Sequence, residues 1–393
     1  MTARRSPAGR THLKHKDPPM LLTRTGLVLL ALVVAAFLAL FVGLRFAFLF
    51  LIGVGFGLTL EGLRFGFAGP WKALVLRRDG RGVMAQLLAI GLTAAVALPL
   101  LAAAPGELMG AHAPVGAAMI AGAFVFGACM QIVMGCGSGT LVNAGSGNAL
   151  GLLALVFFVV GSFLGTLHLA WWTDLASLPV LTLSGLLGAE GALAATLAAL
   201  AAVAVIVAFR AEKGARLPQG RLFLAAGLLA GLAVLNLVVA GQPWGIVYGL
   251  GLWGAKVASA AGADLSQTAF WAAPGNAERL ASSLLTDVTS LTNLGLVAGA
   301  FIAARWRRVM DPAPARPAAR LVGGIVVAAL LMGYASRLAF GCNVGAFFSG
   351  IATGSLHGWA WFAAAFVGSI LGVRILAWLQ TAPTAPARLE TAR

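Results

Sequence analysis

Two cysteines, Cys136 and Cys342, occupy equivalent positions of an internal sequence repeat. Residues 126–139 read FGACMQIVMGCGSG, and residues 332–345 read MGYASRLAFGCNVG, 206 positions later. Each copy has a glycine eight residues before a Gly-Cys pair and another glycine three residues after the cysteine. Glycine-containing stretches can leave helical geometry. A duplicated cysteine of this kind, set in apolar sequence, predicts two symmetric loops that meet within a membrane.

Thiol chemistry indicates what such a pair could do. A thiol is a weak hydrogen-bond donor, is polarisable and costs little to bury, so it suits a sulfur-containing anion. A fixed cation would bind that anion tightly and slow its exit, whereas neutral weak donors allow passage. The alternative is a pair of inert core thiols, and the duplication favours the functional interpretation. The candidate pathway residues are Cys136, Cys342, Arg337, Gly135, Gly139, Gly341, Asn343, Gly345, Gln131 and Cys129.

Arg337 lies five residues before Cys342 in an otherwise apolar helix, and Gln131 is its counterpart in the first copy. An ionisable residue at membrane depth is a functional candidate by default. Its pairing with a carbonyl or an acid is the structural alternative. Cys129 has no counterpart cysteine, and we expect it on one helix with Cys136, two turns earlier. Packing is favoured for it over a step in a thiol relay.

The repeat extends to a second pair of segments. Residues 57–64 read GLTLEGLR, and residues 249–256 read GLGLWGAK. Their last residues, Arg64 and Lys256, are therefore candidates for charged vestibules on opposite sides of the membrane. Arg64 also adjoins a basic loop, so ordinary snorkelling of its side chain explains it equally well.

Composition places these residues in a membrane protein. The chain is 60% hydrophobic and only 10% charged, whereas charged residues make up about a quarter of a soluble domain. Nine apolar runs between residues 26 and 379 approach or exceed the length of about 20 residues that a spanning helix needs. Alanine and glycine fill them, which suits close helix packing in lipid. The predicted fold is an all-α polytopic membrane protein with about nine or ten transmembrane helices, re-entrant or short helices, an inverted internal repeat and an hourglass-like shape.

Loop charge predicts the topology. Lysine and arginine gather in three loops, at 64–81, 210–221 and 305–320, and are absent from two others, at 105–114 and 171–190. The positive-inside rule puts the first three in the cytoplasm and the other two outside. Between the basic loops at 210–221 and 305–320, residues 222–241 cross outward and residues 291–304 cross back. The apolar segment 244–260 between them therefore cannot cross fully and should be re-entrant. Strict symmetry would give nine spans and an external N-terminus. The basic N-terminal tail instead indicates ten spans and a cytoplasmic N-terminus.

The repeat divides the chain into parts. We predict a basic disordered tail at 1–24, a first half with the Gly-Cys loop at 25–170, a connecting segment with one extra helix at 171–220, a second half with the Gly-Cys-Asn loop at 221–380 and a disordered tail at 381–393. The net charge is +15. In a membrane protein such a balance reflects cytoplasmic loops, so no nucleic-acid partner is expected.

Other polar and aromatic residues have structural interpretations. Asp287, Ser290 and Asn293 are expected to open a helix, with Asp or Ser as its cap. Five tryptophans are predicted to be interfacial anchors: Trp244, Trp253, Trp271, Trp359 and Trp361. The histidines have no spacing suited to a metal, and no phosphate-binding loop is present. We therefore expect no metal, no cofactor and no catalytic group.

Two blocks of the chain resemble the YeeE/YedE family of bacterial inner-membrane sulfur transporters. They are residues 130–147, with the core GCGSGTL, and residues 333–359, with GCNVG and SLHGW; the resemblance covers about 53–374. It implies a multi-pass, hourglass-shaped helical protein with inverted halves. It also implies that cysteines near the constriction pass thiosulfate along by transient S–H contacts, and Cys136 and Cys342 match two of those positions. Where members commonly place a further cysteine, this chain has Gly66, so the outer relay step lacks its thiol unless Cys129 compensates.

The expected function is uptake of thiosulfate or a related sulfur anion through a cysteine-lined constriction. Membrane lipid is an expected partner, and a soluble sulfur-carrier protein is a further candidate partner. The first alternative is a membrane thiol enzyme that forms a cysteine persulfide, although no acid or base accompanies either Gly-Cys loop. A selenium-related transporter and a membrane subunit that only docks a sulfur carrier are the others.

Overall fold

The computed structural model describes residues 24–307 and 317–381, and the fold is all-α as predicted. Within these residues ten helical segments are long and apolar enough to cross a membrane, which confirms the polytopic fold. They are α1 (Arg24–Phe41), α2 (Leu44–Gly62), α4 (Arg81–Ala103), α5 and α6 together (Ala117–Gly145), α7 (Ala149–Leu167), α9 (Leu183–Arg210), α10 (Arg221–Ala240), α14 (Val288–Trp306), α15 (Ala319–Leu338) and α17 (Leu356–Gln380).

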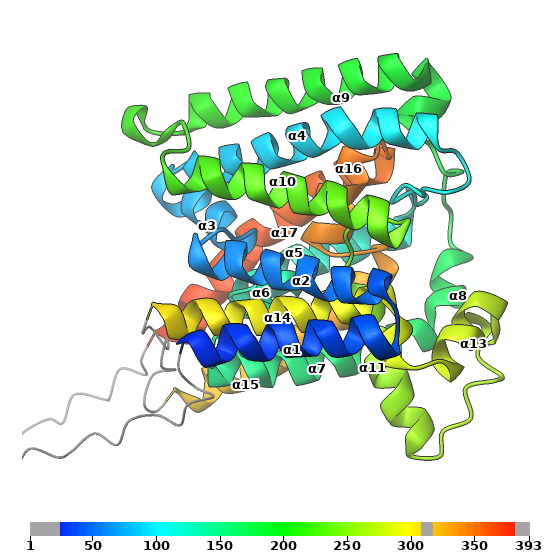
Figure 1. The fold of residues 1–393 in the computed structure, drawn as a ribbon. Coiled ribbons are helices and arrows are strands. Elements are labelled where there is room, and N and C mark those ends of the chain that lie inside the picture. The colour runs from blue at the N-terminus through cyan, green and yellow to red at the C-terminus, as the bar shows by residue number, and fades with distance from the viewer. Residues whose placement is uncertain (1–23, 308–316, 382–393) are drawn as a thin grey trace, which may run out of the picture.

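Short helices lie at the ends of the bundle and at its centre. They are α3 (Ala68–Arg77), α8 (Leu169–Thr173), η2 (Lys213–Ala215), α11 (Val247–Ala260), α12 (Ala269–Ala272), α13 (Pro274–Ala281), η3 (Leu284–Thr286), η4 (Asn343–Ser349) and α16 (Gly350–Ala352). The long helices run side by side, with α3 at one end and α8 and α13 at the other (Figure 1). The loop charges assign the α3 end to the cytoplasm and the α8 end to the outside.

The inverted repeat is visible in the interrupted helices. The first half contains α5 (Ala117–Ile132), a break, α6 (Gly137–Gly145) and then α7; the second contains α15, a break, η4 with α16, and then α17. α5 starts beside the external loops, where the Ala117 amide donates to the carbonyl of Ala176, whereas α15 starts beside the basic loop. The two interrupted helices therefore enter the membrane from opposite sides.

The two breaks share one hydrogen-bond pattern. Met134 and Phe340 both adopt the left-handed conformation, with φ of 60° and 54°. The amide of the following glycine then donates five residues back in each half, over 3.0 Å from Gly135 and 2.9 Å from Gly341. Cys136 therefore caps α6 rather than ending α5, so the expectation that it shares one helix with Cys129 was wrong.

The copies differ by one residue after the cysteine. A left-handed glycine ends the second piece of each broken helix, and it comes eleven residues after Cys136 but twelve after Cys342. The added residue is absorbed by η4, which is a π-helix over Asn343–Ser349. Single extra residues produce π-helical turns of this kind, frequently at functional sites.

The segment between α10 and α14 is re-entrant, as predicted. It starts outside, where the Gly241 carbonyl accepts from the Met109 amide over 2.9 Å. It then descends until Ile246 contacts Gly137 of the first Gly-Cys loop, and the 14-residue helix α11 leads back out. By contrast, its predicted counterpart in the first half belongs to α2, a full span, which favours ten spans over nine.

The start of α1 lies at the cytoplasmic end. The guanidinium of Arg24 lies 5.4 Å from the ring of Trp306, the last residue of α14 before the basic loop. Most of the predicted tails, residues 1–23 and 382–393, and the centre of that loop, residues 308–316, lie outside the described residues.

Other sequence-based expectations had mixed outcomes. Asp287 caps α14 as expected and accepts from the Ser290 amide over 2.7 Å. The interfacial role was wrong for Trp244, Trp271 and Trp361, which are at most 2% exposed. Their rings pack inside the protein, Trp244 on Phe56, Trp361 on Trp71 and Phe126, and Trp271 on Tyr248 and Phe270.

Glycines let the helices approach one another closely. Gly53 and Gly57 of α2 face Gly295 and Gly299 of α14, with four-residue spacing on both helices. A methyl group on Gly57 would overlap the carbonyl oxygen of Leu296, and one on Gly299 would overlap the carbonyl of Val54. This is the small-residue packing expected where lipid offers no hydrophobic driving force.

This interface generates a stability prediction. Gly57→Ala should lower the unfolding free energy by about 1–3 kcal/mol, because the added methyl must separate two backbones. Gly231→Ala in α10 is the matched control: nothing lies within 4 Å of its methyl, and alanine is the better helix former. Thermal unfolding in detergent measures both variants. Equal midpoints for the two would contradict the role of the α2–α14 contact.

Candidate functional site

The two Gly-Cys loops meet at the centre of the protein. Cys136 is 1% exposed and Cys342 is fully buried. A methyl group on Gly137 would lie 2.9 Å from Sγ of Cys342, so this sulfur rests directly against the residue that follows Cys136. The crossing of α5 and α15 produces this meeting, since methyl groups on Gly122 would press on Leu338 and on the backbone of α15.

Each thiol is held by its own loop. Sγ of Cys136 lies 3.3 Å from Oγ of Ser138. Sγ of Cys342 accepts from the amide of Val344 over 3.4 Å. Both residues also stand at helix N-caps, with α6 and η4 leading away from them. Neither thiol has a charged partner among the described residues, so the centre of the molecule is polar but neutral.

A cavity of about 210 Å³ opens on the cytoplasmic side of Cys136, and we call it the inner cavity. Its lining includes Leu60, Glu61, Arg64, Gly66, Gly135, Cys136, Ser138, Gly139 and Asn143. Arg64 lies 3.9 Å from Glu61, and Arg307 pairs with the same carboxylate over 2.9 Å. The lining of the inner cavity therefore holds one cation and one carboxylate, and Arg307, outside the lining, pairs with the same carboxylate. Gly66, where the family resemblance led us to expect a further cysteine for an outer relay step, also lines this cavity.

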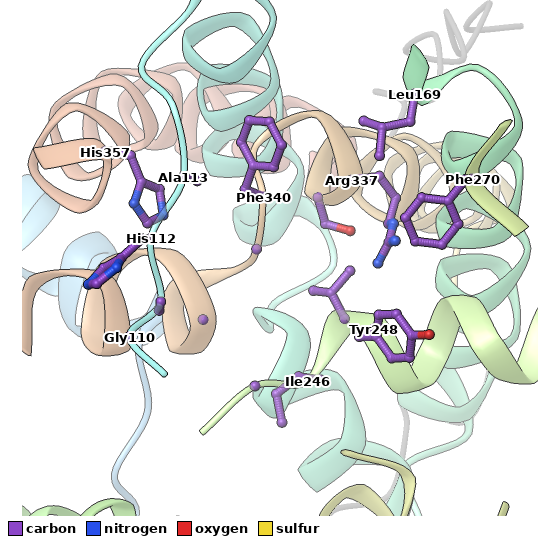
Figure 2. Close-up of a pocket in the computed structure, with 16 residues that line it drawn as sticks. Gly110, His112, Ala113, Leu169, Ile246, Tyr248, Phe270, Arg337, Phe340 and His357 are labelled. Carbon is purple, nitrogen blue, oxygen red and sulfur yellow. The ribbon is translucent and has the colours of Figure 1, made fainter. Parts of the chain in front are cut away.

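A larger cavity, of about 410 Å³, lies on the outer side and is called the outer cavity (Figure 2). Its lining includes His112, Ile246, Tyr248, Phe270, Ser336, Arg337, Phe340, Gly341, Gly345 and His357. Figure 2 shows Arg337 beside Phe270 and Tyr248, with His112 and His357 towards the opposite end. The lining contains no carboxylate, in contrast to that of the inner cavity.

Arg337 is held in place by aromatic rings. The centre of its guanidinium lies 4.7 Å from the ring of Phe270 and 5.8 Å from that of Tyr248. The residue is 9% exposed, and its Nε has no hydrogen-bond partner. Among the described residues no carboxylate pairs with it. Cation–π contacts of this kind fix a guanidinium while leaving its N–H groups available.

A thin wall separates the two cavities. It consists of Cys342, Gly137 and Ile246, whose Cγ2 would lie 3.5 Å from a methyl group on Gly137. The carbonyl of Ile246 is fixed by Nδ2 of Asn293 over 2.9 Å. The two cavities lie on opposite sides of these residues, and the hourglass-like form stays a prediction.

Five of the candidate residues line neither cavity: Cys342 and Asn343, which lie in the second Gly-Cys loop, and Gln131, Cys129 and Lys256, which make other contacts. Gln131 is buried and donates to the carbonyl of Ala68 over 3.0 Å and to Oγ of Ser369 over 2.7 Å. Cys129 is 5% exposed within the hydrophobic core. Lys256 donates to two carbonyls, those of Leu280 and Ser282, and so ties α11 to the external segment instead of lining the outer cavity.

Asn343 takes an unusual position next to Cys342. It is fully buried, yet neither its Nδ2 nor its Oδ1 has a hydrogen-bond partner. Buried polar groups are almost always satisfied, so an amide with two open groups beside the constriction indicates an absent partner such as water or a permeant ion.

Sequence reasoning missed several residues that line the outer cavity. Ile246 and Tyr248 belong to the re-entrant segment, but no pattern indicated which of its residues reach the constriction. Phe270 lies in a short external helix without any sequence signal. His357 did have one, because it stands in the SLHGW block; its Nδ1 lies 2.7 Å from Oγ of Ser355.

No metal cluster is present in the described part of the chain, where His, Cys, Asp and Glu nowhere gather in groups of three. The arrangement instead offers a neutral pair of thiols between two cavities that open on opposite sides.

Comparison with known proteins identifies the family. A family model described as sulphur transport matches residues 63–371. Curated relatives include the proteins named probable transporter YedE of Salmonella typhimurium and Escherichia coli, which are 30% and 29% identical over 151 residues. Each match covers 38% of this chain and 36% of the relative. The ten apolar helices and the bacterial relatives indicate a multi-pass inner-membrane protein. Because the family model spans both Gly-Cys loops, the chain belongs to the sulphur transport family.

Proposed function

We propose that this protein is a permease for the uptake of thiosulfate or a closely related sulfur anion. The observation that carries the proposal is the meeting of Cys136 and Cys342 between an outer and an inner cavity. The anion enters the outer cavity near Arg337, crosses the wall at the two thiols and leaves past Arg64. Membership of a sulphur transport family supports this class of substrate.

The thiols suit this anion for physical reasons. Thiosulfate carries a terminal sulfur that is large and polarisable, and a neutral S–H can donate a weak hydrogen bond to it. Two such donors in succession lower the energy of the anion at the constriction without trapping it. Asn343, which follows Cys342 and whose side-chain amide has no partner among the described residues, is a further candidate donor.

The proposal keeps Cys129 as a packing residue. It lies on α5, before the break, and lines neither cavity. Cys342 lines neither cavity as well, but its sulfur rests against Gly137 of the other Gly-Cys loop. Gln131 likewise acts as a positioning residue, because its amide ties α5 to α17 through Ser369. We therefore assign a pathway role neither to Cys129 nor to Gln131.

A thiol enzyme would use the same residues in a different way. Formation of a persulfide needs a nucleophilic thiolate, and nucleophilic catalysis normally needs an activating base. The nearest side-chain partner of Cys136 is the hydroxyl of Ser138, and Cys342 has only a backbone amide. Mass spectrometry after exposure to thiosulfate discriminates: a covalent adduct on either cysteine would favour the enzyme over the permease.

Removal of either central thiol tests the proposal directly. Purified Cys136→Ala and Cys342→Ala proteins in liposomes should take up labelled thiosulfate about 10- to 100-fold more slowly, since each loses a hydrogen bond to a charged species. Cys129→Ala is the matched control and should retain uptake. Wild-type rates from Cys342→Ala protein would rule out the proposed pathway. A failure of the unmodified protein to transport without a soluble carrier would favour the docking subunit instead.

The wall provides a second test that leaves both thiols intact. In Gly137→Ala the new methyl lies 2.9 Å from Sγ of Cys342, closer than side chains tolerate, and should narrow the constriction. In Gly139→Ala the methyl lies at an ordinary 3.8 Å from Sγ of Cys136. We expect thiosulfate uptake to fall at least about tenfold for the first variant and much less for the second. Equal rates from two well-folded variants would show that the anion passes elsewhere.

A further inference from the structure

The inverted repeat is symmetric in its backbone but not in its charges. The position of Arg337 is taken in the first half by Gln131, whose amide is consumed by internal hydrogen bonds. The cations at the inner cavity, Arg64 in its lining and Arg307 outside it, share the carboxylate of Glu61. The outer cavity thus has a buried cation without a counter-charge, and the inner cavity has none of that kind.

The surroundings of Arg337 form a built site. Its guanidinium is oriented by two rings, those of Phe270 and Tyr248, and its Nε is buried without a partner. A buried cation with no counter-charge is strongly disfavoured unless an anion joins it. The planar fork of a guanidinium matches two oxygens of an oxyanion, which aromatic rings cannot satisfy.

We propose that Arg337, Phe270 and Tyr248 form a binding site for a tetrahedral oxyanion in the outer cavity, and that this site accepts sulfate as well as thiosulfate. This site recognises only the oxygens and the charge of the anion, because none of its three side chains is a thiol. Selectivity for an anion with a terminal sulfur is then due to Cys136 and Cys342, deeper in the protein. The direction in which the anion passes rests on the proposed function. Binding of the anion at this site does not.

Binding in the outer cavity and passage across the thiols should therefore differ in their selectivity for sulfate and thiosulfate. Sulfate should occupy the outer cavity and compete with thiosulfate for entry, yet it should not cross the thiols. Phe270 belongs to α12, in the external segment between α11 and α14, so this segment supplies part of the site that the first half lacks. Although the two halves of the fold are symmetric, the anion therefore binds first on the outer side.

Binding of ³⁵S-labelled sulfate to the purified full-length protein tests the site. Arg337→Met should weaken binding at least about tenfold, as expected for the loss of a charge-assisted bidentate contact. Arg337→Lys should restore part of the affinity, because it keeps the charge but not the fork. Phe270→Leu should weaken binding less than Arg337→Met does. Unchanged affinity in Arg337→Met, or no sulfate binding to the wild type, would overturn the inference.

Arg279→Gln is the matched control. Arg279 lies 4.8 Å from the same Tyr248 ring, but it pairs with Asp287 over 3.9 Å and does not line the outer cavity. Sulfate affinity within about twofold of the wild type is expected for it. A loss equal to that of Arg337→Met would show that general positive charge, and not the site, attracts the anion.

Liposome uptake separates this inference from the proposed function. Excess sulfate should inhibit thiosulfate uptake by the wild type without itself entering. Transport of thiosulfate with no effect of sulfate would overturn the inference alone. Sulfate binding that depends on Arg337, in a protein that transports nothing, would overturn the permease and keep the site. The double variant Cys136→Ala/Cys342→Ala should still bind sulfate, and loss of binding there would contradict the inference.

Discussion

Hydrogen bonding of the backbone inside the membrane is the constraint on which the rest of this structure depends. Two helices stop within the bilayer, where no water satisfies the peptide groups that they leave open. Each break is closed by the same turn, with Met134 or Phe340 in the left-handed region. That conformation costs about 1–2 kcal/mol for such residues. Both breaks line cavities, Met134 and Gly135 the inner one and Phe340 and Gly341 the outer one. A strained residue repeated in both halves points to a constrained function.

Close packing of glycines provides the rigid frame around the breaks. Methyl groups on Gly127 and Gly372 would overlap the backbone across the α5–α17 contact, and methyl groups on Gly161 and Gly333 would do so across the α7–α15 contact. Each interrupted helix is thus held against the uninterrupted helix of the other half. The loops can then leave helical geometry without loosening the bundle, and the sulfur of Cys342 rests against Gly137 of the other loop.

The features that sequence predicted are those with a local or repeated signal. The spans follow from apolar length, the re-entrant segment from the loop-charge count, and the meeting of Cys136 and Cys342 from the duplication. What could not be predicted depends on tertiary contacts. Lys256 matches Arg64 in sequence, but neighbouring carbonyls capture its ammonium. Tryptophans expected at the interface are buried, since hydropathy cannot distinguish lipid contact from interior packing. The π-helix after Cys342 follows from a single extra residue that an alignment of the two motifs does not reveal.

Symmetry of the backbone and asymmetry of the charges have different consequences for transport. The inverted repeat puts both thiols on equivalent loops, although Cys136 lines the inner cavity and Cys342 lines neither cavity. The direction in which an anion is loaded must then depend on the vestibules, where the repeat is broken. Arg337 stands without a carboxylate, whereas Arg64 and Arg307 share Glu61. In the proposed pathway an anion is therefore held more strongly on the outer side than on the inner side. This difference cannot drive net uptake by itself, since a passive pathway only brings the anion concentrations on the two sides to equilibrium. It does set the anion concentration at which the proposed outer site is filled.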